Sequence, residues 1–303
     1  MKPYMTFLIL SFCIISACTS NKKKSVEYFA KSNHFFEKED YVNASKEIDT
    51  AIFLDSTNLD NKILKSKILA NLNLYDDAIL ILKSILSENY KSDTINYLIG
   101  NCYFGMGSRF NTMKTESEKE KDAYNNSIFY TDFALKINPQ YYSAYVQKHR
   151  VLHNLNKYGE SMLILNAAIN LFPDSVYLKL ARGIEKHFLG DDYGAMVEIT
   201  DAIHSNKLDS SDYSDAYRFR ARIYKSNDSI DVAIQDLTKA IGYNPKNELS
   251  YYSRAKLYRA KGLNDEACAD YRKCADLGFI AIYDTIRKYC DGLSVKTRKP
   301  PKQ

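Results

Sequence analysis

The chain repeats itself at a fixed interval, and this period constrains the fold more than any other feature of the sequence. The phrase "DVAIQDLTKAIGYNPKN" at 231–247 has six relatives along the chain, each with a small residue near its start. These small residues are Ala44, Ala78, Ser127, Ser161, Ala195, Ala233 and Ala267. Four of the six successive spacings are 34 residues, and the other two, 49 and 38, equal 34 plus an insertion. A constant period of this length is typical of solenoids built from helix pairs.

Each repeat divides into two helices. Seven residues after each small residue stands another small or apolar one, at Ala51, Ile85, Ala134, Ala168, Ala202, Ala240 and Cys274. Seven residues make two helical turns, so both columns lie on one stripe of the second helix. An aromatic residue precedes the small residue by sixteen positions in four repeats, at Tyr28, Tyr145, Tyr217 and Tyr251. These rings predict an earlier helix that packs against the second one.

The pattern resembles the tetratricopeptide repeat, with Tyr where that family commonly has Trp and with Pro139, Pro173 and Pro245 at the end of the second helix. The resemblance implies an all-α, right-handed superhelical solenoid of about seven helix-turn-helix repeats over residues 25–281. Repeats one to seven are 25–58, 59–92, 93–141, 142–175, 176–213, 214–247 and 248–281. Repeats two, three and five carry Lys62, Asn96 and Lys179 in place of the ring, which leaves the packing of these pairs open. Other helical solenoids and a plain bundle are the alternatives, and the repeated spacing of 34 argues against both.

Repeat three contains the larger insertion, residues 108–122, within "SRFNTMKTESEKEKD". We expect Gly105 and Gly107 to end the first helix ahead of it. The charged insertion then either extends a helix or forms a loop. A variable segment is favoured over a contact with a partner. The smaller insertion, around "KLDSSDYS", lengthens the turn between repeats five and six.

A capping helix at 282–291 follows the last repeat, and a basic tail follows at 292–303. Cys268 and Cys274 lie six residues apart on one helix, a rise of ~9 Å, whereas a disulfide needs Cα atoms within about 7 Å. If the capping helix folds back antiparallel, its Cys290 meets Cys268. The sequence therefore predicts a Cys268–Cys290 disulfide, with Cys274 left at the turn.

The N-terminus carries Lys2 and then the apolar run "FLILSFCII", which is too short to cross a bilayer core of ~30 Å as a helix. This basic start followed by a short apolar run is typical of a signal peptide. Ile15, Ser16, Ala17 and Cys18 resemble the lipobox of bacterial lipoproteins, where the chain is cut before the cysteine and its sulfur receives a diacylglycerol. The resemblance implies a signal peptide at 1–17, a lipidated Cys18 and a tether at 18–24. Ordinary secretion with an incidental cysteine is the alternative.

The net charge of +5 invites a nucleic-acid interpretation, but its distribution argues against one. Eight basic residues lie in the signal, the tether and the tail, which leaves −3 for residues 25–295. Basic residues at the two ends of the chain, next to a lipid anchor, are explained by contact with anionic lipid headgroups or by simple solvation. No phosphate-binding loop, serine elbow or paired CxxC motif occurs. His149 and His153 share a helix face but lack a third ligand. We therefore expect no enzyme activity, no metal, no cofactor and no nucleic-acid partner.

The predicted binding surface is the inner groove lined by the first helices. Residues one and five positions after the packing ring turn toward this groove. The candidates for peptide binding are Arg150, Arg218, Arg222, Lys225, Tyr252, Lys256 and Arg259. Such cations can hold carboxylates, and some tetratricopeptide proteins hold a peptide's terminal carboxylate in this way. Charges paired with neighbouring Asp and Glu are the competing interpretation, and the aromatic middle of the groove at Tyr97, Phe104 and Tyr177 is a further candidate surface.

The sequence thus predicts a lipid-anchored scaffold in the periplasm that binds a protein or peptide, through an acidic segment or a C-terminal carboxylate. Thr19 after the lipidated cysteine favours the outer membrane by the sorting rule of that family. The alternative function is a structural subunit of an envelope assembly complex, similar to the repeat lipoprotein of the β-barrel assembly machinery. A hydrolase with an unrecognised site is the third possibility.

Overall fold

The computed structural model describes residues 3–87, 92–113 and 117–290, and the side chains of residues 20–87, 92–109 and 118–290. All regular structure in these ranges is helical, which confirms the all-α fold class. The chain forms two compact units, residues 1–157 and 158–303. Of the predicted segments, the tail at 292–303 lies outside the described residues.

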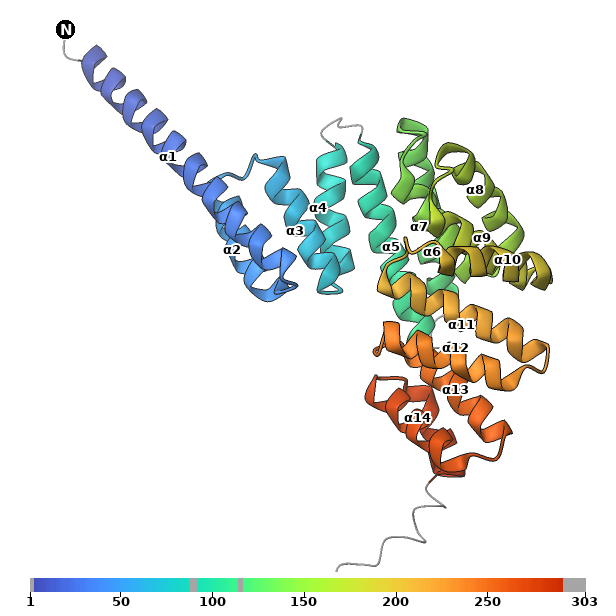
Figure 1. Ribbon diagram of the computed structural model, residues 1–303. Coiled ribbons are helices and arrows are strands. Elements are labelled where there is room, and N and C mark those ends of the chain that lie inside the picture. The colour runs from blue at the N-terminus through green and yellow to red at the C-terminus, as the bar shows by residue number, and fades with distance from the viewer. Residues whose placement is uncertain (1–2, 88–91, 114–116, 291–303) are drawn as a thin grey trace, which may run out of the picture. The chain divides into compact units, whose positions relative to one another are not determined.

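The first unit is a row of antiparallel helix pairs (Figure 1). Helix α1 (Pro3–Glu37) pairs with α2 (Tyr41–Leu54), α3 (Leu59–Asn71) with α4 (Tyr75–Ser87), and α5 (Asp93–Met113) with α6 (Ser117–Ile137). Helix α7 (Tyr142–Asn154) packs on both α5 and α6. The pairs of repeats two and three therefore form although their first helices lack the packing ring.

The second unit continues the same plan. Helix α8 (Tyr158–Leu171) packs on α9 (Val176–Phe188), which pairs with α10 (Asp192–His204). Helix α11 (Ser210–Ser226) pairs with α12 (Ile230–Tyr243), and α13 (Glu248–Ala260) with α14 (Asn264–Asp276). A short 3-10 turn, η1 (Ile280–Ile282), leads into α15 (Tyr283–Tyr289), and both pack on α14. The α-helical part of the cap, α15, thus lies within the predicted capping helix at 282–291.

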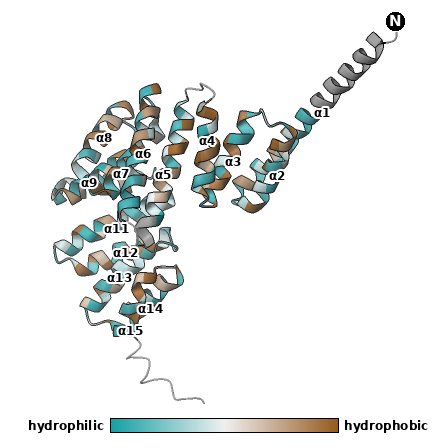
Figure 2. Cartoon of the chain, turned by 180° about the vertical axis from the view of Figure 1, so that it is seen from behind, coloured by the Kyte–Doolittle hydropathy of each residue, from teal (hydrophilic) through white to brown (hydrophobic). Residues whose placement is uncertain are grey.

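The core runs along the contacts between helices. All seven small residues that define the period are 0–1% exposed, and the column seven residues later is 0–3% exposed. Figure 2 shows apolar and hydrophilic residues alternating along the helices, as amphipathic packing requires. Burial of both columns explains the period, because larger or charged side chains there would separate the paired helices.

The turn inside each repeat has one recurring geometry. A residue with φ between +55° and +88° precedes the small residue by five positions in every repeat except the third: Glu39, Asn73, Asn156, Gly190, Asp228 and Gly262. In repeat two, the Asn73 N–H donates to the Ala70 carbonyl and the Leu74 N–H donates to the Leu69 carbonyl, at 3.0 and 2.9 Å. This is the Schellman arrangement, which satisfies carbonyl groups at the end of a helix. The same pair of bonds recurs in the other five turns.

Repeat three is different, and here the prediction that Gly105 and Gly107 end the first helix is wrong. Helix α5 passes through both glycines to Met113, and α6 begins at Ser117, so the described part of the insertion lengthens both helices. A Cβ atom at Gly105 would lie 2.5 Å from the ring of Tyr75, and one at Gly107 would lie 2.6 Å from the ring of Tyr124. The two glycines therefore let the rings of Tyr75 and Tyr124 pack directly against the backbone of α5.

Helix α1 is continuous from Pro3, so the segment predicted as signal, lipidated cysteine and tether belongs to the same helix as the first half of repeat one. Among the described side chains of α1, Ser25 is the first that is buried, and it is 1% exposed. Its Oγ donates to the Ala51 carbonyl at 2.8 Å and accepts from the Asn61 side-chain amide at 3.0 Å. Within the described residues, no helix combines the length and the hydropathy that crossing a bilayer requires. The side chain of Cys18 lies outside the description.

Candidate binding site

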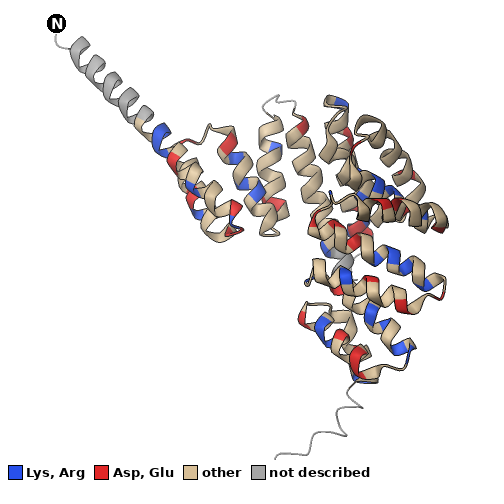
Figure 3. Cartoon of the chain, viewed as in Figure 1, with Lys and Arg blue, Asp and Glu red and all other residues tan. Residues whose placement is uncertain are grey.

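Five of the predicted groove residues come together between α11 and α13. They line one hollow of about 230 Å³ and are Arg218, Arg222, Lys225, Tyr252 and Lys256. We call this hollow the cationic pocket. Its three residues from α11 are spaced four and three apart, so the helical period places them on one stripe. Figure 3 shows Lys and Arg along both helices.

Most of the charge in the cationic pocket is uncompensated. The Arg218 guanidinium donates through Nε and Nη2 to Asp215 Oδ1, at 3.2 and 2.7 Å, one turn earlier on the same helix. Within the described part of the chain, Arg222, Lys225 and Lys256 make no ion pair with a carboxylate. These three side chains belong to exposed residues. The interpretation that the groove cations are paired with neighbouring acids therefore fits Arg218 but not the other three.

The floor of the cationic pocket is apolar, and aromatic rings support its rim. Ala221, Leu237 and Leu257 form the floor and are 1–4% exposed. The Lys256 ammonium lies 5.4 Å from the centroid of the Tyr252 ring. Contacts of cations with ring faces are attractive and restrict the rotamers of long side chains. The arrangement can hold a carboxylate at the rim above a buried apolar surface.

Arg259, which the sequence placed among the groove residues, does not line the cationic pocket. Its guanidinium stacks on the ring of Tyr289, 3.9 Å from the centroid. Tyr289 is the last residue of α15, which packs on α14. The pKa of the Tyr289 hydroxyl is lowered, first by a hydrogen bond with Lys288 and also by the charge of Arg259. The fold-back of the cap thus supplies Arg259 with a partner outside the pocket.

Arg150 lies in the first unit and lines a different hollow, between α5 and α7, of about 120 Å³. Its guanidinium stacks over the ring of Phe104, 5.1 Å from the centroid. Tyr97, one of the aromatic residues predicted for the middle of the groove, lines the same hollow. Tyr177, the third of those aromatic residues, lies on α9 in the second unit. We call the hollow between α5 and α7 the aromatic pocket.

Sequence reasoning missed a column of structural cations. Three residues after the ring position stand Lys31, Lys65, Lys148, Arg182, Arg220 and Arg254, in every repeat but the third. Arg220 forms a two-pronged ion pair with Asp236 of α12, at 2.7 and 3.0 Å, and Arg254 does the same with Asp270 of α14, at 2.8 and 2.9 Å. The pKa of Arg254 is raised, chiefly by this hydrogen bonding to Asp270. The recurrence of a cation at one repeat position could have revealed the column.

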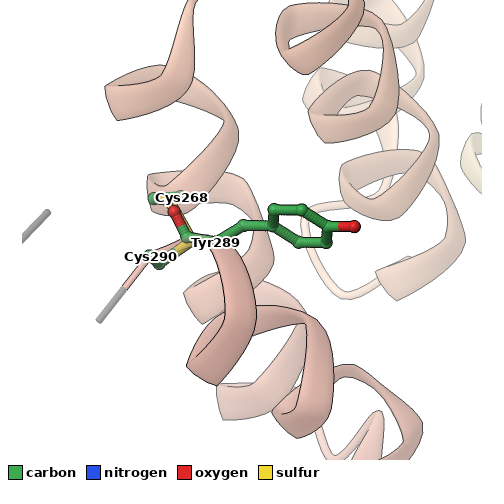
Figure 4. Close-up of a disulfide and its surroundings, with 3 residues drawn as sticks. All are labelled: Cys268, Tyr289 and Cys290. Atoms are coloured by element: carbon green, nitrogen blue, oxygen red, sulfur yellow. Dashed lines mark hydrogen bonds between the residues drawn. A yellow bond between two sulfur atoms is a disulfide. The ribbon is translucent and has the colours of Figure 1, made fainter. Parts of the chain in front are cut away.

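The cysteines of the second unit lie around the cap. Cys268 and Cys290 are joined by a disulfide with a Cα–Cα distance of 5.6 Å (Figure 4). In the same view the ring of Tyr289 points away from the two sulfur atoms. Cys274 is buried with a free thiol, and so is Cys102 in the first unit. Burial raises the pKa of each of these two thiols to about 12, which leaves almost no thiolate near neutral pH.

The two histidines considered as metal ligands lie together on α7. His149 is 6% exposed, in the column that packs against the second helix. Among the residues that the structure describes, no group of three His, Cys, Asp or Glu side chains is placed to hold a metal ion.

Comparison with known proteins agrees with this architecture. Residues 214–247 and 249–277 match the model of the tetratricopeptide repeat. Among curated proteins, human interferon-induced protein with tetratricopeptide repeats 2 is 26% identical over 145 residues, which are 46% of this chain and 31% of the relative. The chain therefore matches less than a third of the length of that relative.

Solved structures show the same fold. A tetratricopeptide repeat protein from Parabacteroides merdae has a TM-score of 0.68 at 19% identity, covering 89% of this chain and 98% of its own. Yeast Tom70 has a TM-score of 0.62 at 18% identity, covering 93% of this chain and 56% of its own. A monomeric mutant of IFIT1, solved with Gppp-AAAA, has a TM-score of 0.56 at 14% identity, covering 90% of this chain and 69% of its own. Residues 214–247 and 249–277 are thus tetratricopeptide repeats, and the described chain has the helix-pair fold of these solved structures.

Proposed function

We propose that this chain is a lipid-anchored scaffold of the bacterial periplasm that binds an acidic segment of a protein or peptide in the cationic pocket. The observation that carries the proposal is the set of three unpaired cations, Arg222, Lys225 and Lys256, around one hollow. An unpaired cation cluster attracts carboxylates, and Arg can bind them through two parallel hydrogen bonds. The apolar floor adds room for an apolar side chain beside the acid.

The anchor proposal depends on the lipobox-like sequence before Cys18 and on how close that cysteine is to the solenoid. Ser25 follows Cys18 by seven positions, and its side chain makes a buried hydrogen bond to α2. In a helix this spans ~10 Å, so lipidation would hold repeat one near the membrane surface. Cys18→Ala should abolish incorporation of labelled fatty acid and release the protein from membranes. Membrane fractionation of this variant at the wild-type level would show that the lipid is not the anchor.

Binding in the cationic pocket can be tested with a defined probe. A fluorescent hexaglutamate peptide, with a free carboxyl terminus or as its amide, should bind the full chain with an affinity that falls as salt rises. Ion pairs at an open site are screened, with a Debye length of ~8 Å at physiological ionic strength. Salt-insensitive binding, or tighter binding of a short RNA oligonucleotide than of hexaglutamate, would contradict the proposal.

Charge reversal locates the site. Arg222→Glu with Lys256→Glu changes the net charge by four. Deletion of residues 296–303 removes four basic residues and leaves the residues of the cationic pocket unchanged. We expect the double reversal to weaken binding of hexaglutamate by at least about tenfold, or ~1.4 kcal/mol, and the deletion to have a small effect. Equal losses from both changes would show that binding follows net charge rather than this pocket. Crosslinking in intact cells then identifies the natural partner.

A further inference from the structure

The aromatic pocket of the first unit occupies the same place in the repeat as the cationic pocket of the second. Both lie between the first helices of consecutive repeats, three and four in one case and six and seven in the other. When the repeats are aligned, Tyr97 stands where Arg218 does, Asn101 where Arg222 does, and Phe104 where Lys225 does. The chain therefore places rings and an amide at positions where the other pocket has cations.

One wall of the aromatic pocket is held rigidly by Gln147 of α7. Its side-chain amide donates to Ser127 Oγ at 3.2 Å and to Thr131 Oγ1 at 3.1 Å. Both hydroxyl protons are already engaged, since Ser127 donates to the Gly100 carbonyl and Thr131 donates to the Ser127 carbonyl. Only lone pairs therefore face Gln147, and this fixes which end of its amide points to the hydroxyls.

Gly100 makes room for that network. A Cβ atom at this position would lie 2.7 Å from Gln147 Nε2 and 2.9 Å from Thr131 Oγ1. Gln147 is only 5% exposed, and its Oε1 has no hydrogen-bond partner among the described residues. The wall is thus pre-organised, which lowers the conformational entropy that a ligand must overcome on binding.

The opposite wall, on α5, carries the rings of Tyr97 and Phe104, and the guanidinium of Arg150, from α7, lies over Phe104. Phe104 lies between the Arg150 guanidinium and the ring of Tyr124, whose centroid is 6.1 Å away. Burial raises the pKa of the Tyr97 hydroxyl, so this group is protonated near neutral pH. Arg150 is an exposed residue, and the described part of the chain supplies it with no carboxylate.

These features suit one kind of ligand group. Rings prefer other rings in offset or edge-to-face contact, and an aromatic side chain gains more than an aliphatic one from such a pocket. Arg150 at the rim can accept a carboxylate next to that ring without leaving Phe104. A ligand with a positive charge would be repelled by Arg150.

We propose that the aromatic pocket binds an aromatic side chain of the partner that stands next to an acidic residue in its sequence. The inference rests on the proposed function, because it assumes that the groove binds a peptide, and it narrows the partner to a segment carrying both features. The cationic pocket binds carboxylates, while the aromatic pocket supplies the selection for a ring. Each pocket is complete within its own unit.

The test uses the full chain and two labelled octapeptides that differ at one position. Both carry the same number of Glu residues, and one has Phe at its centre where the other has Ala. We expect the wild-type protein to bind the Phe peptide at least about tenfold more tightly than the Ala peptide. Replacement of Glu by Gln beside the ring should weaken binding of the Phe peptide to wild type more than to Arg150→Gln.

Two variants locate the preference for the ring. Phe104→Ala removes one wall, and Asn101→Trp fills the hollow from an exposed position without removing a core contact. Both should abolish the preference for Phe while hexaglutamate still binds in the second unit. Circular dichroism at the wild-type helix content would show that the first unit of each variant is also folded. The double reversal Arg222→Glu with Lys256→Glu is the matched control and should keep the preference. Equal affinity of wild type for the two peptides, or a preference that survives in both pocket variants, would overturn the proposal. Failure of hexaglutamate to bind would instead refute the cationic pocket and leave the comparison of Phe with Ala valid.

Discussion

Asp236→Ala in repeat six should destabilise the protein far more than Asp49→Ala in repeat one. Each substitution removes the carboxylate that pairs with a cation of the column described above. Asp236 is paired with Arg220, and the two side chains are 4% and 12% exposed. Asp49 is paired with Lys65 at 2.8 Å, but its side chain is 59% exposed. The N···O distances of the two pairs, 2.7 and 2.8 Å, are nearly equal, so the pairs differ mainly in how deeply they are buried.

The expected magnitude follows from that burial. Removing one partner of a buried pair costs about 3–5 kcal/mol, because the other charge remains without compensation. Arg220 keeps a contact with Thr200 Oγ1 at 3.5 Å and lies 5.2 Å from the Tyr217 ring centroid, so we expect the lower end, ~3 kcal/mol. For the exposed pair, Asp49→Ala should cost about 0–1 kcal/mol. At roughly 2–4 °C per kcal/mol, the melting temperature should fall by about 6–12 °C for Asp236→Ala.

Thermal denaturation followed by circular dichroism measures both shifts. Because repeat proteins can unfold in parts, hydrogen exchange of α11 and α12 should report the same loss locally. Replacing both partners together, Arg220→Met with Asp236→Leu, should recover most of the stability, since an apolar pair leaves no buried charge. Equal shifts for Asp236→Ala and Asp49→Ala, or a double variant as unstable as Asp236→Ala, would refute the argument.

Three further predictions concern the cap, the glycines and the buried thiols. Cys290→Ser should lower the stability of the C-terminal cap by about 3 kcal/mol, the entropy of closing a loop over a separation of 22 residues; peptide mapping that finds Cys268 and Cys290 as free thiols in native protein would contradict the pairing. Gly105→Ala should destabilise the folded protein by about 1–3 kcal/mol because its Cβ meets the Tyr75 ring. Gly159→Ala, with no neighbouring atom within 4 Å, should stabilise it by about 0.5–1 kcal/mol. A gain in melting temperature from both variants would count against the contact of Gly105 with Tyr75. Cys102 and Cys274, with pKa values raised to about 12, should resist iodoacetamide near neutral pH in the folded protein and react after unfolding; rapid labelling of native protein would show that burial does not control them.

The period of 34 determined much of this protein without a structure. Small residues at fixed positions such as Ala44 and Ala233 require close helix pairs, and local hydrogen bonding then fixes the turns, as the positive φ at Asn73 and Gly262 shows. The same helical geometry predicted that Arg218 and Arg222 face one side of α11. The helix pairs and the side of α11 that carries these cations follow from residues near one another in sequence, which is why the sequence alone could predict them. The turns are also local, but the sequence analysis did not identify their geometry.

Other features depended on contacts between residues far apart in the chain. Gly105 looked like a helix end, but the ring of Tyr75, thirty residues earlier, explains why a residue without a side chain stands within α5. The sequence placed Arg259 in the groove, but α15 folds back and its Tyr289 ring stacks on the Arg259 guanidinium. The ion pair of Arg220 depends on which carboxylate the neighbouring helix presents sixteen residues later. A helical pattern specifies the direction of a side chain, but its partner is decided only when the neighbouring helix is in place.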